Sequence, residues 1–174
     1  ANTFAADPIA IGSRRELFID RYLIDRLENT TLKLHEPQLA PPMSEPANSL
    51  EYGTVIKDGD LFRLYTRDGR GAKFDGDSTE VTRYCESKDG IHWIKLQLGL
   101  YELEGTKQNN VILHEKSVCH NFSPFLDTRP GVPANERFKA LAGTILRNPG
   151  GGLIAFTSGD GIHWRRLHDK PVMT

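Results

Sequence analysis

Short runs of alternating apolar and polar residues dominate the chain after residue 50. Strict alternation with a period of two residues predicts half-buried β-strands. Four such runs occupy 52–56, 61–65, 81–86 and 92–96, and four more occupy 122–126, 137–142, 153–157 and 163–167. The linkers are mostly short and rich in turn residues, so consecutive strands are expected to pair antiparallel. Each set of four runs therefore predicts one antiparallel meander sheet.

The first 50 residues follow no single period. We expect a strand at 17–19, then a turn and a short segment around 22–24, and an alternating strand at 31–35. The following stretch up to residue 46 contains four prolines and predicts an irregular connector. The sequence predicts one incomplete domain with three parts. These are an arm and connector at 1–46, a first sheet unit at 47–104 and a second at 105–174.

One seven-residue motif occurs twice, 71 residues apart. Residues 87–93 read Ser-Lys-Asp-Gly-Ile-His-Trp and residues 158–164 read Ser-Gly-Asp-Gly-Ile-His-Trp. An Asp-Gly pair between alternating segments predicts a tight hairpin turn, because glycine adopts a positive φ at little cost. We interpret the motif as a structural turn whose Trp is an apolar anchor. The alternative interpretation makes His92 and His163 ligands or acid–base groups.

A four-stranded meander that returns about every 70 residues is typical of a β-propeller blade. The expected fold class is therefore all-β, with two propeller blades and an N-terminal arm. Propellers close with about four to eight blades, so two blades predict an incomplete ring. We expect either a portion of a longer protein or a chain that self-associates through its open blade edges.

The repeated turn resembles the Asp-box-like turns of β-propeller glycosidases. With the segments 17–20, 32–37, 109–113 and 137–141, it makes the chain similar to a bacterial family of five-bladed propellers related to the invertase, arabinanase and xylosidase superfamily. The resemblance implies a carbohydrate partner, glycan hydrolysis or binding, and a secreted or periplasmic location. It also implies an acid–base Glu in a third blade, which these two blades do not include, so this portion alone is expected to be inactive.

Composition narrows the choice of partners. The chain has 22 basic and 23 acidic residues, and this balance argues against a nucleic-acid partner. No apolar run approaches the roughly 20 residues of a membrane span, so no membrane is expected. The two cysteines, Cys85 and Cys119, match no zinc motif. They are expected to be two free thiols, or one bridge in an exported protein.

The resemblance also implies where chemistry lies. In propeller glycosidases the catalytic carboxylates stand near the entrance to the first strands, on the face that carries the loops between second and third strands. Glu51 precedes the first strand of the first blade and is the candidate catalytic residue. At the first-blade entrance, residues 48–51 read Asn-Ser-Leu-Glu where such enzymes carry an Asp, which leaves hydrolysis in question. The candidate substrate-binding residues are His120, Asn121, Arg67, Arg70, Asp75 and Asp77.

Two alternatives stay open for these candidates. Each side chain is also explained as a solvated loop residue, and the whole unit as a non-catalytic module that binds glycan or protein. No cofactor is expected. Asp75-Gly76-Asp77 resembles part of a calcium loop, but the 12-residue ligand pattern of such loops is missing.

Overall fold

The computed structural model describes residues 7–44, 51–144 and 152–173, apart from the side chain of Glu51. The chain divides into two compact units, Ala1–Ala40 and Pro41–Thr174. The described residues of the first unit form isolated turns, with neither helix nor strand. In one of these turns the backbone N–H of Tyr22 donates to the Asp20 carboxylate over 2.8 Å.

The strands expected at 17–19 and 31–35 are therefore wrong. Alternation makes a strand only where a second strand satisfies the backbone N–H and C=O groups. Residues 7–40 contain no such partner strand. The irregular connector predicted up to residue 46 agrees with the structure at residues 37–44, which contain no helix or strand.

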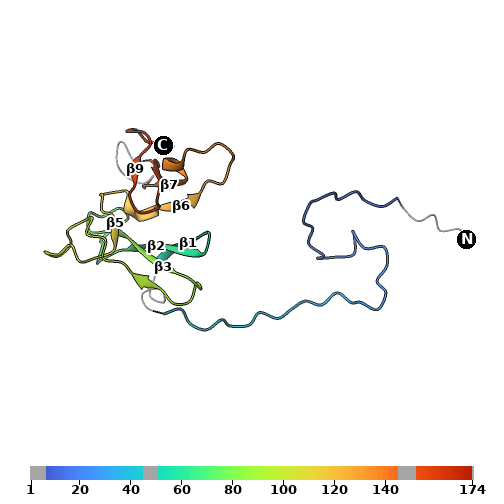
Figure 1. Ribbon diagram of the computed structural model, residues 1–174. Helices are drawn as coiled ribbons and strands as arrows, with labels where there is room; N and C mark the ends of the chain where they lie inside the picture. The colour runs from blue at the N-terminus through green and yellow to red at the C-terminus, as the bar shows by residue number, and fades with distance from the viewer. Residues whose placement is uncertain (1–6, 45–50, 145–151, 174) are drawn as a thin grey trace, which may run out of the picture. The chain divides into compact units, whose positions relative to one another are not determined.

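The second unit contains a first sheet built mainly from residues 51–95 (Figure 1). Its strands β1 (Glu51–Asp58), β2 (Leu61–Asp68), β3 (Val81–Ser87) and β4 (Ile94–Lys95) pair antiparallel in chain order. A fifth strand, β5 (Val111–Leu113), pairs with the beginning of β3. The hairpin between β1 and β2 turns at Gly59-Asp60, where Gly59 has a φ of 62°.

The second sheet follows the same order of strands. Its members are β6 (Ser123–Leu126), β7 (Phe138–Ala142), β8 (Ile154–Ser158) and β9 (Arg165–Arg166), again antiparallel neighbours along the chain. Two short 3₁₀ turns, η2 (Cys119–Asn121) and η3 (Ala134–Glu136), precede β6 and β7. The described residues contain no α-helix. All eight strands expected after residue 50 are present, which confirms an all-β, antiparallel chain; the strand β5 was not expected. Between the runs at 137–142 and 153–157 the sequence Asn-Pro-Gly-Gly-Gly at 148–152 predicts a glycine-rich turn, and this stretch lies largely outside the described residues.

The main hydrophobic core lies between the two sheets. It unites Tyr65 and Tyr84 of the first sheet with Phe138 and Phe156 of the second. The ring of Phe122, just before β6, lies 6.3 Å from the Tyr65 ring and 6.2 Å from the Phe156 ring, measured between centroids. A smaller cluster of Leu64, Cys85 and Trp93, with Phe62 packed against it, forms separately within the first sheet. Large buried aromatic side chains of this kind supply much of the apolar area that a small β domain removes from water.

The two copies of the repeated motif form the same turn, called here the first turn (87–93) and the second turn (158–164). In each, the Ser hydroxyl lies 3.0 Å from an oxygen of the Asp carboxylate and accepts the Gly N–H over 2.9 Å. The Asp carboxylate accepts two backbone N–H groups, from the Ile and the His, over 2.8 to 2.9 Å. The His ring lies 2.7 Å from the second Asp oxygen. These bonds fix the shape of the turn from within, as expected of a structural element.

The pairing register shows that the loops lie at two opposite ends of the strands, each called here an edge. Phe62 pairs with Lys57 and with Ser87, so the first turn leaves the edge where β1 ends. Phe138 pairs with Leu126 and with Ser158, so the second turn leaves the corresponding edge of the second sheet. We call this the turn edge. The opposite edge, called the loop edge, carries the start of β1, the loop between β2 and β3, and η2.

Candidate functional site

The loop from 69 to 80 at the loop edge is shaped by its own carboxylates. Asp77 accepts the backbone N–H groups of Lys73 and Thr79 over 3.1 and 3.0 Å. These bonds, led by the one from Thr79, lower the pKa of Asp77. Gly76, with a φ of 80°, approaches the neighbouring segment so closely that a Cβ there would lie 2.9 Å from the Ser117 Cα. The loop is therefore held in one shape, and the carboxylate of Asp77 is engaged in holding it.

The centre of the loop edge is a cluster of Arg67, Glu80 and His120. The His120 Nδ1 lies 2.8 Å from the Arg67 Nη1 and 3.0 Å from the Glu80 Oε1. The Glu80 side chain is only 2% exposed, and its other oxygen accepts the backbone N–H of Gly76 over 3.2 Å. Arg67 and Glu80 also form an ion pair at 3.7 Å. A buried carboxylate with both oxygens engaged is suited to orienting its neighbours rather than to contacting a ligand.

Which ring nitrogen of His120 carries the proton depends on the neighbour with which its Nδ1 forms a hydrogen bond. An arginine only donates, so a bond from Arg67 requires Nδ1 to carry a lone pair and places the proton of the neutral ring on Nε2. A bond to Glu80 requires the proton on Nδ1. The Nε2 atom faces Asp75, at 3.5 Å from its Oδ1, and the Asp75 side chain is 68% exposed. His120 thus presents its Nε2 to the exposed Asp75 side chain as a donor or an acceptor.

An aromatic ring completes the cluster. Tyr52 has a φ of 50° and lies at a β-bulge, where the register between β1 and β2 shifts. Bulges re-aim side chains, and positive φ at a bulky residue is uncommon outside such positions. The Arg67 guanidinium lies over the Tyr52 ring at 4.5 Å from its centroid, and the Tyr52 and His120 rings are 6.4 Å apart.

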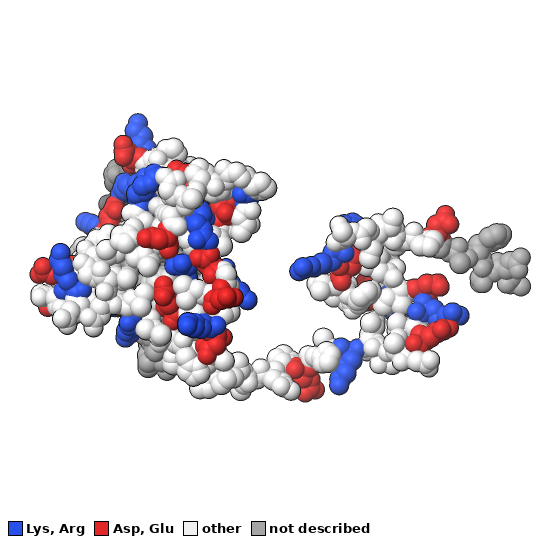
Figure 2. All heavy atoms as spheres, in the orientation of Figure 1, with Lys and Arg blue, Asp and Glu red and all other residues white. Residues whose placement is uncertain are grey.

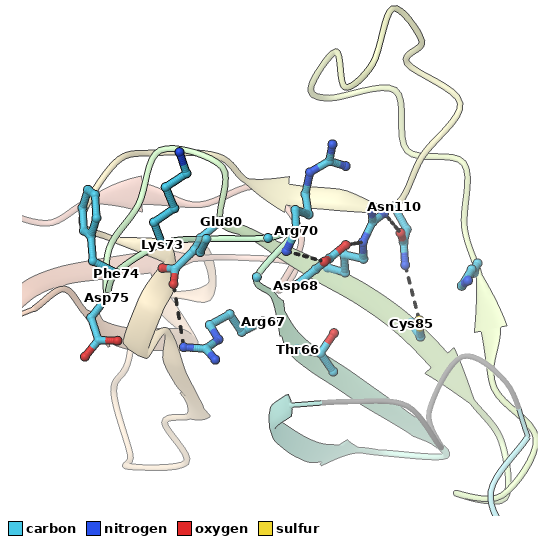
Figure 3. A pocket seen from close by; sticks show the side chains of 15 residues that line it. Thr66, Arg67, Asp68, Arg70, Lys73, Phe74, Asp75, Glu80, Cys85 and Asn110 are labelled. Carbon is cyan, nitrogen blue, oxygen red and sulfur yellow. Dashed lines mark hydrogen bonds and ion pairs between the residues drawn. The ribbon is translucent and has the colours of Figure 1, made fainter.

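Two hollows flank Arg67. The larger has a volume of about 730 Å³ and extends from the loop to β3 and β4 (Figure 3). Its charged lining consists of Arg67, Asp68, Arg70, Lys73, Asp75, Glu80, Arg83 and Lys95, joined by the apolar ring of Phe74. The smaller, of about 180 Å³, lies between β1 and the η2–β6 segment and is lined by Tyr52, Thr54, Arg67, His120, Asn121 and Ser123 among others. The larger volume is within the range of small-molecule sites.

The structure brings four of the sequence-predicted residues together at the loop edge: Arg67, Arg70, Asp75 and His120. Arg70 donates to the exposed Glu104 carboxylate over 2.5 Å. Asn121 donates to the Gly143 carbonyl over 3.1 Å and lines the smaller hollow. Asp77 shapes the loop, as described above. The backbone of Glu51 pairs with Arg67, so this candidate begins β1 at the loop edge, but its side chain lies outside the described residues.

Sequence patterns did not single out Glu80 or Tyr52. Glu80 ends a long polar loop, where a carboxylate is normally solvated, and only the fold shows that it is buried. Tyr52 lies in a run that alternates like the other strands. Gly53, which follows it, is the signal that could have indicated the bulge, because a glycine inside a strand often marks one. His92 and His163, the alternative ligands, lie at the turn edge in bonds to Asp89 and Asp160.

Neither cysteine belongs to a disulfide or to a metal site among the described residues. Cys85 and Cys119 are unpaired buried thiols. Burial raises the pKa of both, that of Cys119 to about 12, which makes them poor nucleophiles. Among the described residues, no group of three or more His, Cys, Asp or Glu side chains is arranged to hold a metal ion. The described part of the chain also contains no helix that is long and apolar enough to cross a membrane.

Comparison with known proteins gives partial likenesses. No family model matches the chain. The sensor proteins QseC of Escherichia coli O157:H7 and of Escherichia coli strain K12 are each 33% identical to it over 76 residues, which is 44% of this chain. The chain spans only 17% of the length of these curated relatives.

One solved structure is similar in part. It is an N-acetylgalactosamine deacetylase from F. plautii in complex with blood group B trisaccharide, with a TM-score of 0.46 and 22% sequence identity. The likeness covers 72% of this chain and 31% of the deacetylase chain. At these shares and this TM-score, none of the likenesses assigns the chain to a family.

Proposed function

We propose that this chain is part of a carbohydrate-active β-propeller and that its loop edge binds a glycan. Two consecutive four-stranded antiparallel meanders, each with the same Ser-x-Asp-Gly-Ile-His-Trp turn before its last strand, support the propeller part of the proposal. The proposal includes further blades that complete a ring and, in a bacterium, a secreted or periplasmic location. Glycan binding is its central claim.

The cluster of Arg67, His120 and Tyr52 is the observation that carries the glycan site. A sugar presents hydroxyl groups that both donate and accept hydrogen bonds, and a ring face of C–H groups. The cluster offers a fixed donor in Arg67, an imidazole nitrogen in His120 and an aromatic ring in Tyr52, beside hollows of suitable size. A few oriented polar groups in a hollow with an aromatic wall are typical of small-molecule sites.

Binding is favoured over hydrolysis by the state of the carboxylates. Glycoside hydrolysis generally needs two carboxyl groups on opposite sides of the scissile bond. Glu80 is buried with both oxygens engaged, and Asp75 is the carboxylate of this cluster that remains exposed. Hydrolysis is the second candidate function, because the backbone register places Glu51 at the same edge, opposite Arg67.

Titration calorimetry with a panel of oligosaccharides tests the binding proposal. We expect His120→Ala to weaken the affinity at least about tenfold, since it removes a hydrogen-bonding group that Arg67 and Glu80 hold in place. The control is His92→Ala, an exposed histidine at the turn edge. Equal affinities for the two variants, or no saccharide bound by the unaltered chain, would contradict the proposal.

The hydrolysis candidate has its own test. If the edge also cleaves glycans, Glu51→Gln abolishes the release of reducing ends while the glycan affinity is retained, because the amide cannot exchange a proton at the scissile bond. Unchanged product release by this variant removes Glu51 from the reaction. Binding without any product release leaves the module non-catalytic.

A further inference from the structure

The larger hollow is more basic than the chain as a whole. Its lining contains five basic side chains, Arg67, Arg70, Lys73, Arg83 and Lys95, and three acidic ones, Asp68, Asp75 and Glu80. The hollow therefore carries a formal excess of two positive charges, whereas the chain has a net charge of −1. Over the visible face of the second unit, by contrast, acidic and basic side chains are interspersed (Figure 2). A concave surface with an excess of one sign of charge attracts ligands of the opposite sign.

Two of the acids are already committed to partners inside the hollow. Asp68 accepts the Arg83 Nε over 2.6 Å and the Arg70 backbone N–H over 3.1 Å. Glu80 holds His120 and Arg67. Within the part of the chain that the structure describes, Lys73 and Lys95 have no side-chain partner, and both are exposed. The excess charge thus resides on groups that are available to a ligand.

Arg83 lines this hollow and is held in a fixed orientation. Its Nε is bonded to Asp68, and its Nη1 donates to the Asn110 side-chain oxygen over 3.0 Å. Asn110 is in turn anchored by its amide, which donates to the Tyr84 carbonyl over 2.7 Å and to the Cys85 sulfur over 3.4 Å, the latter bond drawn in Figure 3. The Arg83 Nη2 has no partner among the described residues. An arginine fixed in this way recognises a carboxylate with little further loss of side-chain entropy.

We propose that the glycan bound at the loop edge is acidic, a saccharide with carboxylate groups such as a uronic-acid oligosaccharide. This inference rests on the proposed function. In this proposal the Arg83 guanidinium, Lys73 and Lys95 bind carboxylate groups of the saccharide. A sugar ring packs on Phe74, which lines the hollow and is 60% exposed. The cluster around His120 then forms hydrogen bonds with the neighbouring hydroxyl groups of the sugar.

Calorimetry with uronic-acid oligosaccharides and with their methyl esters tests the inference. The ester keeps the sugar and removes the charge. We expect the acids to bind at least about tenfold more tightly than the esters at low salt. The preference should shrink as the salt concentration rises toward about 0.5 M, because exposed charges are screened there.

Double lysine variants show which part of the surface causes the preference for acids over esters. The double variant K73Q/K95Q should reduce the preference for the acid about threefold to tenfold, since it removes two exposed charges that pair with the carboxylates. The matched control K88Q/K107Q removes two exposed lysines outside the hollow and should leave the preference unchanged.

The outcomes separate this inference from the function on which it rests. Equal affinity for acids and esters, with binding still lost in His120→Ala, overturns the acidic ligand and keeps the glycan site. No binding of acids, esters or neutral saccharides overturns both. Inorganic phosphate that binds as tightly as the acidic oligosaccharides overturns the requirement for a sugar. An equal loss of preference in K73Q/K95Q and K88Q/K107Q removes the larger hollow as the site.

Discussion

The first and second turns have nearly the same sequence and the same internal hydrogen bonds, yet they meet different surroundings. The second turn packs on the first sheet: Tyr65 donates its hydroxyl proton to the Gly161 carbonyl over 3.0 Å, and Arg63 donates to the Asp160 carbonyl over 2.9 Å. The first turn meets the connector instead, where the Ser44 N–H donates to the Ile91 carbonyl over 2.9 Å.

The two tryptophans differ in the same way. Trp164 donates its indole N–H to the Gly161 carbonyl over 3.1 Å, and its ring stands edge-on to the Phe122 ring at 4.9 Å between centroids. Trp93 packs with Leu64 and Cys85, and its indole N–H has no acceptor among the described residues. The comparison teaches that the motif folds from its own side chains, while its value to the packing depends on the neighbouring sheet.

The largest difference is expected at the glycine of the motif. In Gly161→Ala the new Cβ would lie 2.6 Å from the Tyr65 hydroxyl and 3.4 Å from the Phe138 ring, whereas in Gly90→Ala the nearest atoms are 4.0 Å away. Both glycines have a φ near +76°, which costs an alanine about 1–2 kcal/mol. Overpacking adds about 1–3 kcal/mol for Gly161→Ala alone. Urea denaturation should therefore show a clearly larger loss of unfolding free energy for Gly161→Ala.

A loss of the same size in both glycine variants would contradict the packing difference. The far-UV circular dichroism of each variant serves as the control that its strands still form. If Gly161→Ala does not fold, Tyr65→Phe, which removes only the hydroxyl near Gly161, measures the same contact, at about 0.5–1.5 kcal/mol.

A smaller difference is expected at the tryptophans. Trp164→Phe removes an indole N–H that has an acceptor, and should cost about 1 kcal/mol more than its counterpart Trp93→Phe. In Trp93→Phe the lost donor is buried without an acceptor among the described residues, so its removal relieves a desolvation cost. Chemical denaturation compares the two variants, and a greater loss for Trp93→Phe would reverse this ranking.

The smallest difference is expected in the response to acid. The pKa of Asp89 lies below its ordinary value, chiefly because of its bond with His92. For Asp160 burial raises the pKa, but bonds with His163 and Ile162 outweigh it and the net shift is again downward. A carboxyl group with a lowered pKa stabilises the fold above its unfolded pKa of about 4, and this stabilisation is lost as the pH falls toward the folded pKa.

The melting temperature should therefore fall as the pH is lowered below about 4, and the slope should be reduced equally in Asp89→Asn and Asp160→Asn. The two carboxylates are similarly exposed, 48% and 52% for the side chains, and accept the same bonds. Scanning calorimetry between about pH 5 and pH 2.5 measures the slopes. A reduced slope in only one variant would show that the two networks are not equivalent.

The strands of both sheets could be predicted from the sequence because alternation and turn residues agree along these segments. Phe62 and Phe138, for instance, lie in alternating runs that follow clear turns. The same alternation at 31–35 gave a wrong prediction, because a strand also needs a second strand to pair with. Whether such a strand lies beside it depends on the tertiary fold and not on the local sequence. The strand β5 was missed since Val111–Leu113 is too short to show a period.

The candidate site was predictable only in outline. Arg67, Asp75 and His120 could be selected because they lie in loops or at strand ends on one edge. That Glu80 orients His120 could not be predicted, because its burial depends on how the loop folds back onto η2. The fixed orientation of Arg83 also depends on Asn110, which is 27 residues away in the chain.

The contact between the two sheets joins two unlike surfaces. Arg63 and Tyr65 of the first sheet donate to the carbonyls of Asp160 and Gly161 in the second turn. In the other direction, Arg137, directly before β7, donates to Asp58 at the end of β1. Asp58 forms an ion pair with Arg63 at 3.0 Å. A contact between two unlike surfaces is heterologous, and no two-fold axis relates its sides.

The second sheet carries a pair of the same kind at the matching register positions, with Asp127 accepting from Lys139 over 2.6 Å. Lys139 follows Phe138 as Arg63 follows Phe62. The acid–base pair therefore recurs in the second sheet at the same positions. Because the two sides of the contact are unlike, a further sheet added in the same manner joins head to tail and not head to head.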